Sequence, residues 1–267
     1  MDKDRIAKAA EAVVYAREGA ARMTLPLPDG LPPRDIAEAY AIQDSVLERY
    51  IAMSPMRRRI GGWKIALTTP TMQSMCKIDH PCEGAIFTDR IQNTDGTCRA
   101  DRFSHLGGES EIAVQLGADL PAGAQPWTAA SVAPHVEALM PAIEIVDDRH
   151  CPYGEIGGGQ LIAENAFNWG IVLGRPVTDW RGLDLEAIKG RMLVDGQQVG
   201  EGCGADALGH PLAAVAWAAN ALNARGRRIE KGQVVMTGSL VRTCWLGRGQ
   251  TMETEIEGLD RAKLWVI

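Results

Sequence analysis

Two glutamates separated by one residue introduce an apolar run in "GGESEIAVQLGADLP", residues 107–121. Because side chains alternate between faces along a strand, Glu109 and Glu111 would point the same way, roughly 6.5–7 Å apart along the chain. Neighbouring carboxylates repel each other, and burying either one without a partner is costly. The pair therefore predicts either a solvent-exposed strand end or a cation bound between the two carboxylates.

A third candidate ligand is Glu144, which interrupts the apolar segment "MPAIEIVDDR". Ile143 and Ile145 would face the opposite way on a strand, and a lone glutamate here could also be an edge residue facing water. Three carboxylates on neighbouring strands, with no cysteine or histidine close in sequence, suit a hard cation such as Mg²⁺ or Mn²⁺. Zinc is disfavoured, because the 5 histidines show no ligand spacing.

Lys64 lies inside the apolar segment "GGWKIALT". An ammonium is rarely left unpaired among apolar neighbours, although a lysine can also extend along such a surface and keep its charge in water. An ammonium about 4 Å from a carboxylate is worth roughly 4 kcal/mol at an effective dielectric constant near 20. Three carboxylates and one divalent cation leave net negative charge, so an anionic substrate would need this further positive group.

The elements that position these residues follow from hydrophobic periodicity. Helical spacing predicts amphipathic helices over residues 3–20 and 34–54, a further helix near 128–140, and one in "HPLAAVAWAANALNARG". From about residue 60 onward, short apolar runs broken by Gly, Pro, Asn and Asp predict a series of strands. Asp195-Gly196 is the signature of a two-residue hairpin. The strands are expected in "GGWKIALTT", "GAIFTD", "SEIAVQLG", "PAIEIVDD", "AFNWGIVLG", "GRMLVDGQQVG", "GQVVMTGSL", "TMETEIEGL" and "AKLWVI".

This order of elements predicts an α+β fold dominated by a mixed sheet. A helical N-terminal lobe is expected over residues 1–55, and a catalytic domain over residues 56–267.

Composition excludes several classes of protein. The net charge is −6 and the longest basic run is "RRR" at 57–59, which argues against a nucleic-acid partner. Nowhere do 18 apolar residues follow one another, so no membrane span is expected. The N-terminal segment lacks the apolar core of a signal peptide, and the 6 scattered cysteines form no C-x-x-C pair. We therefore expect a cytoplasmic protein with reduced thiols.

Several segments, in this order and spacing, resemble one family over nearly the whole chain. The chain is similar to the 2-keto-4-pentenoate hydratases, with 2-oxo-hept-4-ene-1,7-dioate hydratase and 4-oxalocrotonate decarboxylase, in the fumarylacetoacetate hydrolase superfamily. The resemblance is carried by "AYAIQ", "GWKIALTTPTMQ", "ESEIAVQLGADLP", "PAIEIVDDR", "IAENAFNWGIVLG", "LGHPLAAVAWAANAL", "VVMTGSL" and "IEGL".

The resemblance implies a mixed β-roll, a homo-oligomer, and possible association with another enzyme of the pathway. It implies Mg²⁺ or Mn²⁺ held by the three glutamates, with the carboxylate and the 2-oxo oxygen of the substrate chelating the ion. Lys64 would stand beside the bound 2-oxo acid and assist the enol–keto step. The substrate would also be held by the "TGS" segment, Thr237, Gly238 and Ser239.

The chain departs from the family pattern in "IDHPCEGAIF". Cys82 occupies the position where the hydratases carry an aspartate, and we expect Glu83 to take over its acidic, proton-transferring role from the next position. A shift of one residue on a strand turns a side chain to the other face. Asp79 is interpreted as a turn residue. Glu164 and Phe167 also differ from the family pattern and indicate an altered pocket.

The leading hypothesis is a metal-dependent hydratase that converts a 2-hydroxy-2,4-dienoate to a 4-hydroxy-2-oxo acid, as in aromatic meta-cleavage catabolism. An alternative on the same scaffold is decarboxylation of a 2-oxo-enedioate, or hydrolytic cleavage of a C–C bond in an acylpyruvate. A third hypothesis, motivated by the departure at Cys82 and Glu83, is a non-catalytic partner subunit that keeps the fold and the metal.

Overall fold

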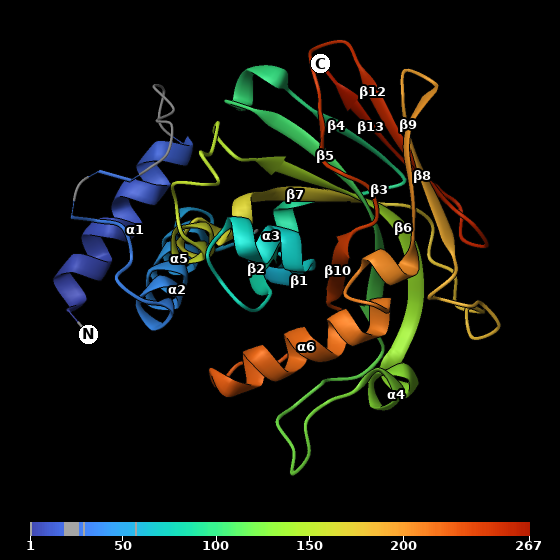
Figure 1. Cartoon of the computed structure of the whole chain (residues 1–267), viewed down its shortest axis with the longest axis horizontal. Coiled ribbons are helices and arrows are strands. Elements are labelled where there is room, and N and C mark those ends of the chain that lie inside the picture. Colours follow the sequence, from blue (N-terminus) through green and yellow to red (C-terminus); the bar gives the residue numbers. More distant parts are fainter. Residues whose placement is uncertain (1, 19–26, 29, 57) are drawn as a thin grey trace.

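The computed structural model describes residues 2–18, 27–28, 30–56 and 58–267, and two helices come first in it (Figure 1). They are α1 (Lys3–Glu18) and α2 (Ile36–Met53), which confirm the two predicted N-terminal helices; residues 19 and 20 of the first lie outside the described residues. The side chain of Asp35 caps α2 by accepting a hydrogen bond from the amide of Glu38. The buried stripe of α2, which includes Ile42 and Val46, follows the helical period.

Thirteen strands form two sheets in the described residues, and every segment predicted as a strand contributes to one of them. The larger sheet has the order β2 (Cys82–Phe87), β1 (Ile60–Ala66), β10 (Val234–Ser239), β5 (Leu106–Leu116), β6 (Val136–Asp147), β7 (Asn168–Leu173), β3 (Ile91–Asn93), and β11 (Cys244–Trp245) also pairs with β5. The smaller sheet has the order β4 (Asp95–Cys98), β13 (Arg261–Val266), β12 (Thr251–Ile256), β8 (Lys189–Val194), β9 (Gln197–Cys203). Parallel and antiparallel pairs both occur, so the expected mixed fold of helices and sheets is confirmed.

One predicted helix is wrong in extent. Residues 128–140 form only α4 (Ala129–Val132) and a 3₁₀ turn (Ala133–His135), and then β6 begins at Val136. Pro134 has no amide hydrogen to donate to a helical hydrogen bond, so the helix ends there and the following apolar residues enter the sheet.

The last long helix, α6 (Pro211–Ala224), is confirmed, as is the hairpin between β8 and β9. In that turn both Asp195 and Gly196 have positive φ, as a type I′ turn requires. Two short helices, α3 (Pro70–Met75) and α5 (Gly158–Ala163), were not predicted.

The larger sheet is covered on one face, which we call the outer face. Helix α6 packs against β1, β5 and β10 (Figure 1). Helices α1 and α2 pack against each other and belong to the same apolar cluster, which includes Trp63 and Ile112. The smaller sheet packs against β6 through residues such as Ile143 and Ile145. The opposite face, which we call the inner face, carries a separate apolar cluster that includes Met236. Because side chains alternate, Glu144 and its equivalents on β5 are left on the inner face.

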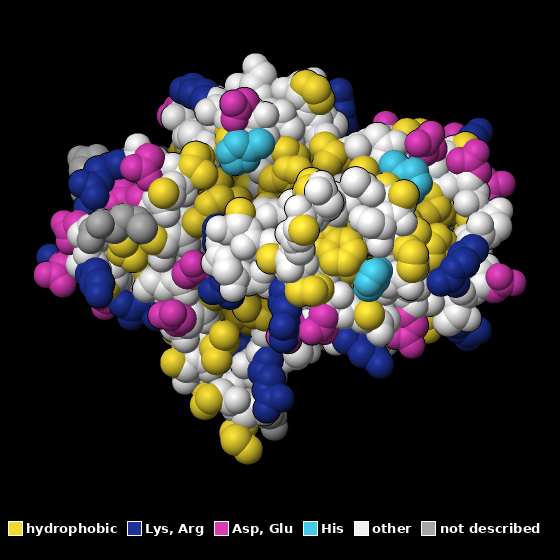
Figure 2. All heavy atoms as spheres, turned by 90° about the horizontal axis from the view of Figure 1, so that it is seen from below, with side chains coloured by type: hydrophobic (Ala, Val, Ile, Leu, Met, Phe, Trp, Pro, Cys, Tyr) yellow, Lys and Arg dark blue, Asp and Glu magenta, His cyan; other side chains and the backbone are white. Residues whose placement is uncertain are grey.

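On the molecular surface of the side shown in Figure 2, acidic and basic side chains are interspersed around a more hydrophobic centre. Within the described part of the chain, none of the helices combines the length and the apolar character needed to cross a bilayer.

Candidate metal centre and active site

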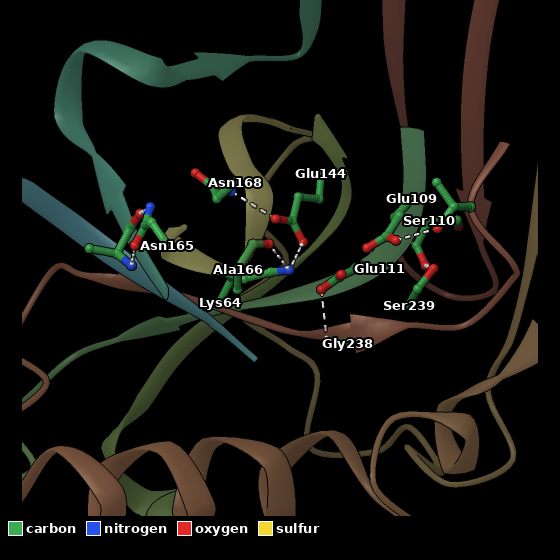
Figure 3. A network of polar contacts seen from close by, with 12 residues as sticks. Lys64, Glu109, Ser110, Glu111, Glu144, Asn165, Ala166, Asn168, Gly238 and Ser239 are labelled. Carbon is green, nitrogen blue, oxygen red and sulfur yellow. Dashed lines mark hydrogen bonds and ion pairs between the residues drawn. The ribbon is translucent and has the colours of Figure 1, made fainter. Parts of the chain in front are cut away.

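The three glutamates predicted as metal ligands lie together on the inner face (Figure 3). In the antiparallel pair of β5 and β6, Glu109 stands directly opposite Glu144, and Glu111 follows two residues later on the same face. One carboxylate oxygen from each lies within 4.8 Å of the other two. Glu111 and Glu144 are 0% exposed, whereas Glu109 is partly accessible. The cluster therefore has two buried carboxylates and a third through which solvent or substrate could reach it.

A bulge in β10 supports this cluster. The pairing of β10 with β5 shifts between Met236 and Ser239, where β10 has one residue more than its partner. The extra turn places the amide of Gly238 2.8 Å from Oε2 of Glu111, to which it donates. Gly238 has φ +110°, and a Cβ there would lie 2.6 Å from Cγ2 of Thr68, so only glycine fits.

The other carboxylates are also held by side chains. Asn168 Nδ2 donates to Glu144 Oε1 at 2.8 Å, and the hydroxyl of Thr243 donates to Glu109 Oε1. Oε1 of Glu111 is fully buried and has no hydrogen-bond partner among the described residues. Three neighbouring carboxylates, one with a buried oxygen that lacks a hydrogen-bond partner, form a suitable set of ligands for a hard divalent cation. The residues present thus fit Mg²⁺ or Mn²⁺.

Lys64 comes from β1 and is 3% exposed, so it is not a surface lysine. Its Nζ lies 3.1 Å from Oε2 of Glu144 and donates to the carbonyl of Ala166 at 3.2 Å (Figure 3). Burial lowers the pKa of Lys64, but the nearby carboxylates of the cluster outweigh this and hold its pKa above the ordinary value. The raised pKa keeps the ammonium of Lys64 charged at neutral pH next to the cluster.

Burial and mutual repulsion make it unfavourable for the carboxylates of the cluster to be ionised together. Burial, reinforced by the neighbouring carboxylates, raises the pKa of Glu111 well above its ordinary value. Burial likewise raises the pKa of Glu144 to about 7, although Lys64 opposes the shift. Without a cation, the cluster thus takes up a proton near neutral pH. A divalent cation would replace that proton.

The raised pKa values of Glu111 and Glu144 predict how metal binding depends on pH. A carboxyl whose pKa is raised on folding stabilises the fold below its unfolded pKa, near 4.5, and this contribution is lost as pH rises through about 7. We therefore expect the metal-free protein to lose thermal stability between about pH 5 and pH 8, and the increase in Tm on adding Mg²⁺ to grow over the same range. Thermal unfolding with EDTA and with Mg²⁺ at a series of pH values measures both effects. A metal-induced Tm shift that shrinks as pH rises would contradict the cluster as the binding site.

Of the "TGS" segment, Gly238 is the residue that contacts the cluster. The hydroxyl of Thr237 donates to the carbonyl of Ile112 at 2.8 Å, and that of Ser239 donates to the carbonyl of Val241. Both hydroxyls are therefore already engaged with the main chain. Within this segment, only the amide of Gly238 donates to a glutamate of the cluster, and the role of the segment in binding substrate stays a prediction.

Glu83 lies elsewhere. In the pairing of β2 with β1, Gly84 stands opposite Lys64, so Glu83 points to the outer face. There it is 0% exposed, accepts a hydrogen bond from the hydroxyl of Tyr40 at 2.6 Å, and forms an ion pair with Arg225. Our expectation that Glu83 transfers protons in the site is wrong for this geometry. The residues of β2 on the face of Lys64 are Cys82, Gly84 and Ile86, and burial raises the pKa of the Cys82 thiol.

Glu83 is therefore expected to affect stability rather than chemistry. Glu83→Gln removes one charge of a buried ion pair, and we expect it to lower the free energy of unfolding by about 3 kcal/mol while Mn²⁺ affinity stays unchanged. Urea unfolding and calorimetric Mn²⁺ titration measure the two quantities. The matched control is Glu48→Gln, because Glu48 is exposed on α2. A loss of metal affinity in Glu83→Gln without a loss of stability would restore Glu83 to the site.

Asn168, which donates to Glu144, and Ala166, whose carbonyl accepts from Lys64, were not among the predicted site residues. Both belong to "IAENAFNWGIVLG", and the only signal was the polar Asn168 at the start of an apolar strand. The other departures from the family pattern, Glu164 and Phe167, lie in the same segment. Glu164 is ion-paired with Arg149 at 2.5 Å, and Phe167 packs edge-on against Tyr153.

The family model for the fumarylacetoacetate hydrolase C-terminal region matches residues 87–266. The chain is 32% identical over 238 residues to 2-keto-4-pentenoate hydratase of Paraburkholderia xenovorans, which covers 89% of this chain and 86% of that protein. It is also 32% identical over 254 residues to 2-hydroxyhexa-2,4-dienoate hydratase of Comamonas testosteroni, covering 94% of each. The chain therefore belongs to the fumarylacetoacetate hydrolase family, among the relatives of the 2-keto-4-pentenoate hydratases.

The fold is shared with solved structures of other proteins. The 4-oxalocrotonate decarboxylase of Pseudomonas putida G7, complexed with magnesium and adipate, superimposes with a TM-score of 0.91 at 24% identity and covers 100% of this chain and 99% of that one. The fumarylpyruvate hydrolase of Pseudomonas aeruginosa, in complex with Mn²⁺ and pyruvate, has a TM-score of 0.61 at 12% identity and covers 79% of this chain and 89% of that one.

Proposed function

We propose that this protein is a metal-dependent hydro-lyase that adds water to a 2-hydroxy-2,4-dienoate and forms a 4-hydroxy-2-oxo acid. The observation that carries the proposal is the convergence of three carboxylates beside a buried ammonium on the inner face. The chain's relatives named as hydratases support the same reaction. We propose Mg²⁺ or Mn²⁺ as the cofactor, held by Glu109, Glu111 and Glu144.

The proposed chemistry has two steps. The C2 hydroxyl of the dienol loses its proton and C5 gains one, which leaves a conjugated enone; water then adds its oxygen at C4 and a proton at C3. A divalent cation, when bound, supplies Lewis acidity toward the 2-oxo oxygen. The ammonium of Lys64 favours negative charge on the adjacent substrate and holds an exchangeable proton at Nζ. Its bonds to Glu144 and Ala166 orient that proton.

Decarboxylation is the second candidate, and the position of Cys82 favours it. The inner face of β2 presents this neutral thiol, and the adjacent carboxylate of Glu83 points away. Hydration requires a group that activates water, whereas loss of carbon dioxide from a 2-oxo-enedioate breaks a C–C bond and leaves its electron pair in a conjugated enolate, which then takes a proton. The same ammonium would favour that enolate.

The wider assembly is also part of the proposal. We propose that the two sheets form the β-roll of this superfamily, with residues 1–55 as a helical lobe and 56–267 as the catalytic domain. The turn at Gly238 would border the bound 2-oxo acid, with the main chain of Thr237 and Ser239 beside it. A homo-oligomer is proposed as the working state, and association with another enzyme of the pathway is a further proposal.

Product analysis tests the reaction. Purified protein with Mg²⁺ is mixed with 2-hydroxypenta-2,4-dienoate and, separately, with 4-oxalocrotonate, while dienol absorbance is followed and the product is weighed by mass spectrometry. We expect a product heavier by one water from the first substrate, and no product after EDTA treatment.

Each other outcome has a distinct meaning. Carbon dioxide released in step with loss of 4-oxalocrotonate, without hydration of the dienoate, would overturn the hydratase in favour of the decarboxylase. Inactivity of the isolated chain on both substrates, together with co-purification of an active relative, would instead support a non-catalytic partner subunit.

A further inference from the structure

A sharply turned segment lies between α5 and β7, next to the candidate metal centre. Asn165, Ala166 and Phe167 have φ values of 54°, 48° and 61°, so three successive residues other than glycine adopt the left-handed conformation. Residues with a Cβ rarely adopt it even singly, and a run of three persists only where surrounding contacts enforce it. The segment is also buried, with Asn165 3% and Phe167 4% exposed.

This turn delivers two groups to the site. The carbonyl of Ala166 accepts from Nζ of Lys64 at 3.2 Å, and the side chain of Asn168 donates to Oε1 of Glu144 at 2.8 Å (Figure 3). A relaxed backbone at 165–167 would move both groups. The orientation of one proposed metal ligand and of the proposed catalytic ammonium therefore depends on this turn.

Two sets of contacts hold the turn in place. On one side, the side chain of Asn165 bonds to both main-chain groups of Ala85 on β2, at 2.7 and 2.9 Å. On the other, the guanidinium of Arg17 donates from Nη1 to the carbonyl of Glu164 at 2.6 Å and from Nη2 to the carbonyl of Asn168 at 2.5 Å. These two carbonyls lie immediately before and after the three left-handed residues. A planar guanidinium can bridge two such acceptors, which a single ammonium does less well.

Arg17 belongs to α1, far from this turn in sequence, and α1 has separate attachments to α2 and to the segment that precedes it. Arg5 forms an ion pair with Glu38 at 2.6 Å and donates to the carbonyl of Pro32 at 2.5 Å. Arg49 of α2 donates to the carbonyl of Ala7 at 3.1 Å. Docking of the helix therefore does not depend on Arg17 alone, and its bonds to the turn can have a separate role.

We propose that Arg17 is a positioning residue for the metal centre: by bridging the carbonyls of Glu164 and Asn168 it fixes the turn that orients Asn168 and Glu144. The proposal rests on the proposed function, because it assumes that the three glutamates bind the metal. It predicts that a residue of the first helix, which touches none of the ligands, controls their affinity for the ion.

The experiment is a double-mutant cycle read out as the Mn²⁺ affinity of the metal-free protein, measured by calorimetry. The variants are Arg17→Met, Asn168→Ala and the double variant, with Arg5→Met as the matched control on the same helix. Because partners of metal ligands typically contribute about 10- to 100-fold in affinity, we expect about a 10-fold loss in each single variant. The affinity of the double variant should fall no further than that of the weaker-binding single variant, because both changes disrupt the same series of contacts from Arg17 through Asn168 to Glu144. Arg5→Met should lower the urea midpoint and leave the affinity within about twofold.

The outcomes separate the possible failures. An unchanged affinity in Arg17→Met, or losses that multiply in the double variant, would overturn the role of Arg17. An equal loss in Arg5→Met would assign the effect to packing of the helix and also overturn it. If Arg17→Met does not fold, Arg17→Lys is the test, because lysine keeps the positive charge but lacks the two-pronged guanidinium that bridges both carbonyls. We expect an intermediate loss of Mn²⁺ affinity, and wild-type affinity would refute the proposal. Absence of Mn²⁺ binding by the wild-type protein would instead refute the metal centre itself.

Discussion

Glu109→Ala is expected to abolish tight metal binding and to lower kcat/KM at least 1,000-fold, which corresponds to about 4 kcal/mol of transition-state stabilisation. The variant removes one of three carboxylates that lie within 4.8 Å of one another. Because Glu109 also repels Glu111 and Glu144, its loss should leave the metal-free protein at least as stable as the wild type. The stabilising effect of added Mg²⁺ should disappear with it.

Calorimetric titration with Mn²⁺, thermal unfolding with and without Mg²⁺, and the dienoate assay measure these three effects. Glu137→Ala is the matched control, because Glu137 is exposed on β6. Full turnover by Glu109→Ala after rigorous removal of metal would refute the metal-dependent mechanism. A large loss of stability in the metal-free variant would show that Glu109 has a structural role instead.

Lys64→Met is expected to lower the rate of the reaction without weakening metal binding. The ammonium lies 3.1 Å from a carboxylate of Glu144, and its removal should lower kcat by about 100- to 10,000-fold if it orients and carries a proton in the reaction. Its positive charge also repels a cation in the same cluster. Loss of Lys64 also raises the pKa of Glu144 further, so the comparison is made at pH 8.5, where protons compete less with the metal; there the variant should bind Mn²⁺ at least as tightly as the wild type.

Single-turnover rates together with Mn²⁺ titration at pH 8.5 test this separation, with Lys189→Met, a change at an exposed position of β8, as the control. A loss of metal binding equal to that of Glu109→Ala would mean that Lys64 acts only by keeping Glu144 ionised. Unchanged turnover would exclude the ammonium from the reaction.

The carboxylate cluster could be predicted because the positions of its residues follow local rules. Alternation along β5 places Glu109 and Glu111 on one face, and an isolated Glu144 between Ile143 and Ile145 indicates the facing strand. The direct pairing of Glu109 with Glu144 required the register of the two strands, which no local pattern specifies.

The errors have equally local causes. Glu83 was assigned to the site from its neighbourhood in sequence, but it lies one residue away from Cys82 on β2 and so faces the helices. The prediction of a helix near 128–140 did not take Pro134 into account, and the helix ends at this residue. The bonds of Arg17 could not be predicted at all, because main-chain carbonyls 147 and 151 residues away carry no sequence signature.

The bridge made by Arg17 has a thermodynamic consequence for the first helix. If docking of α1 against the turn at 165–167 raises the affinity of the three carboxylates for a cation, then a bound cation must favour docking of α1 by the same factor. Docking of α1 and binding of the cation are thus linked by a single coupling free energy. Occupancy of the site would thus be transmitted to the amino-terminal helix, which would exchange its amide hydrogens more slowly whenever the ion is present.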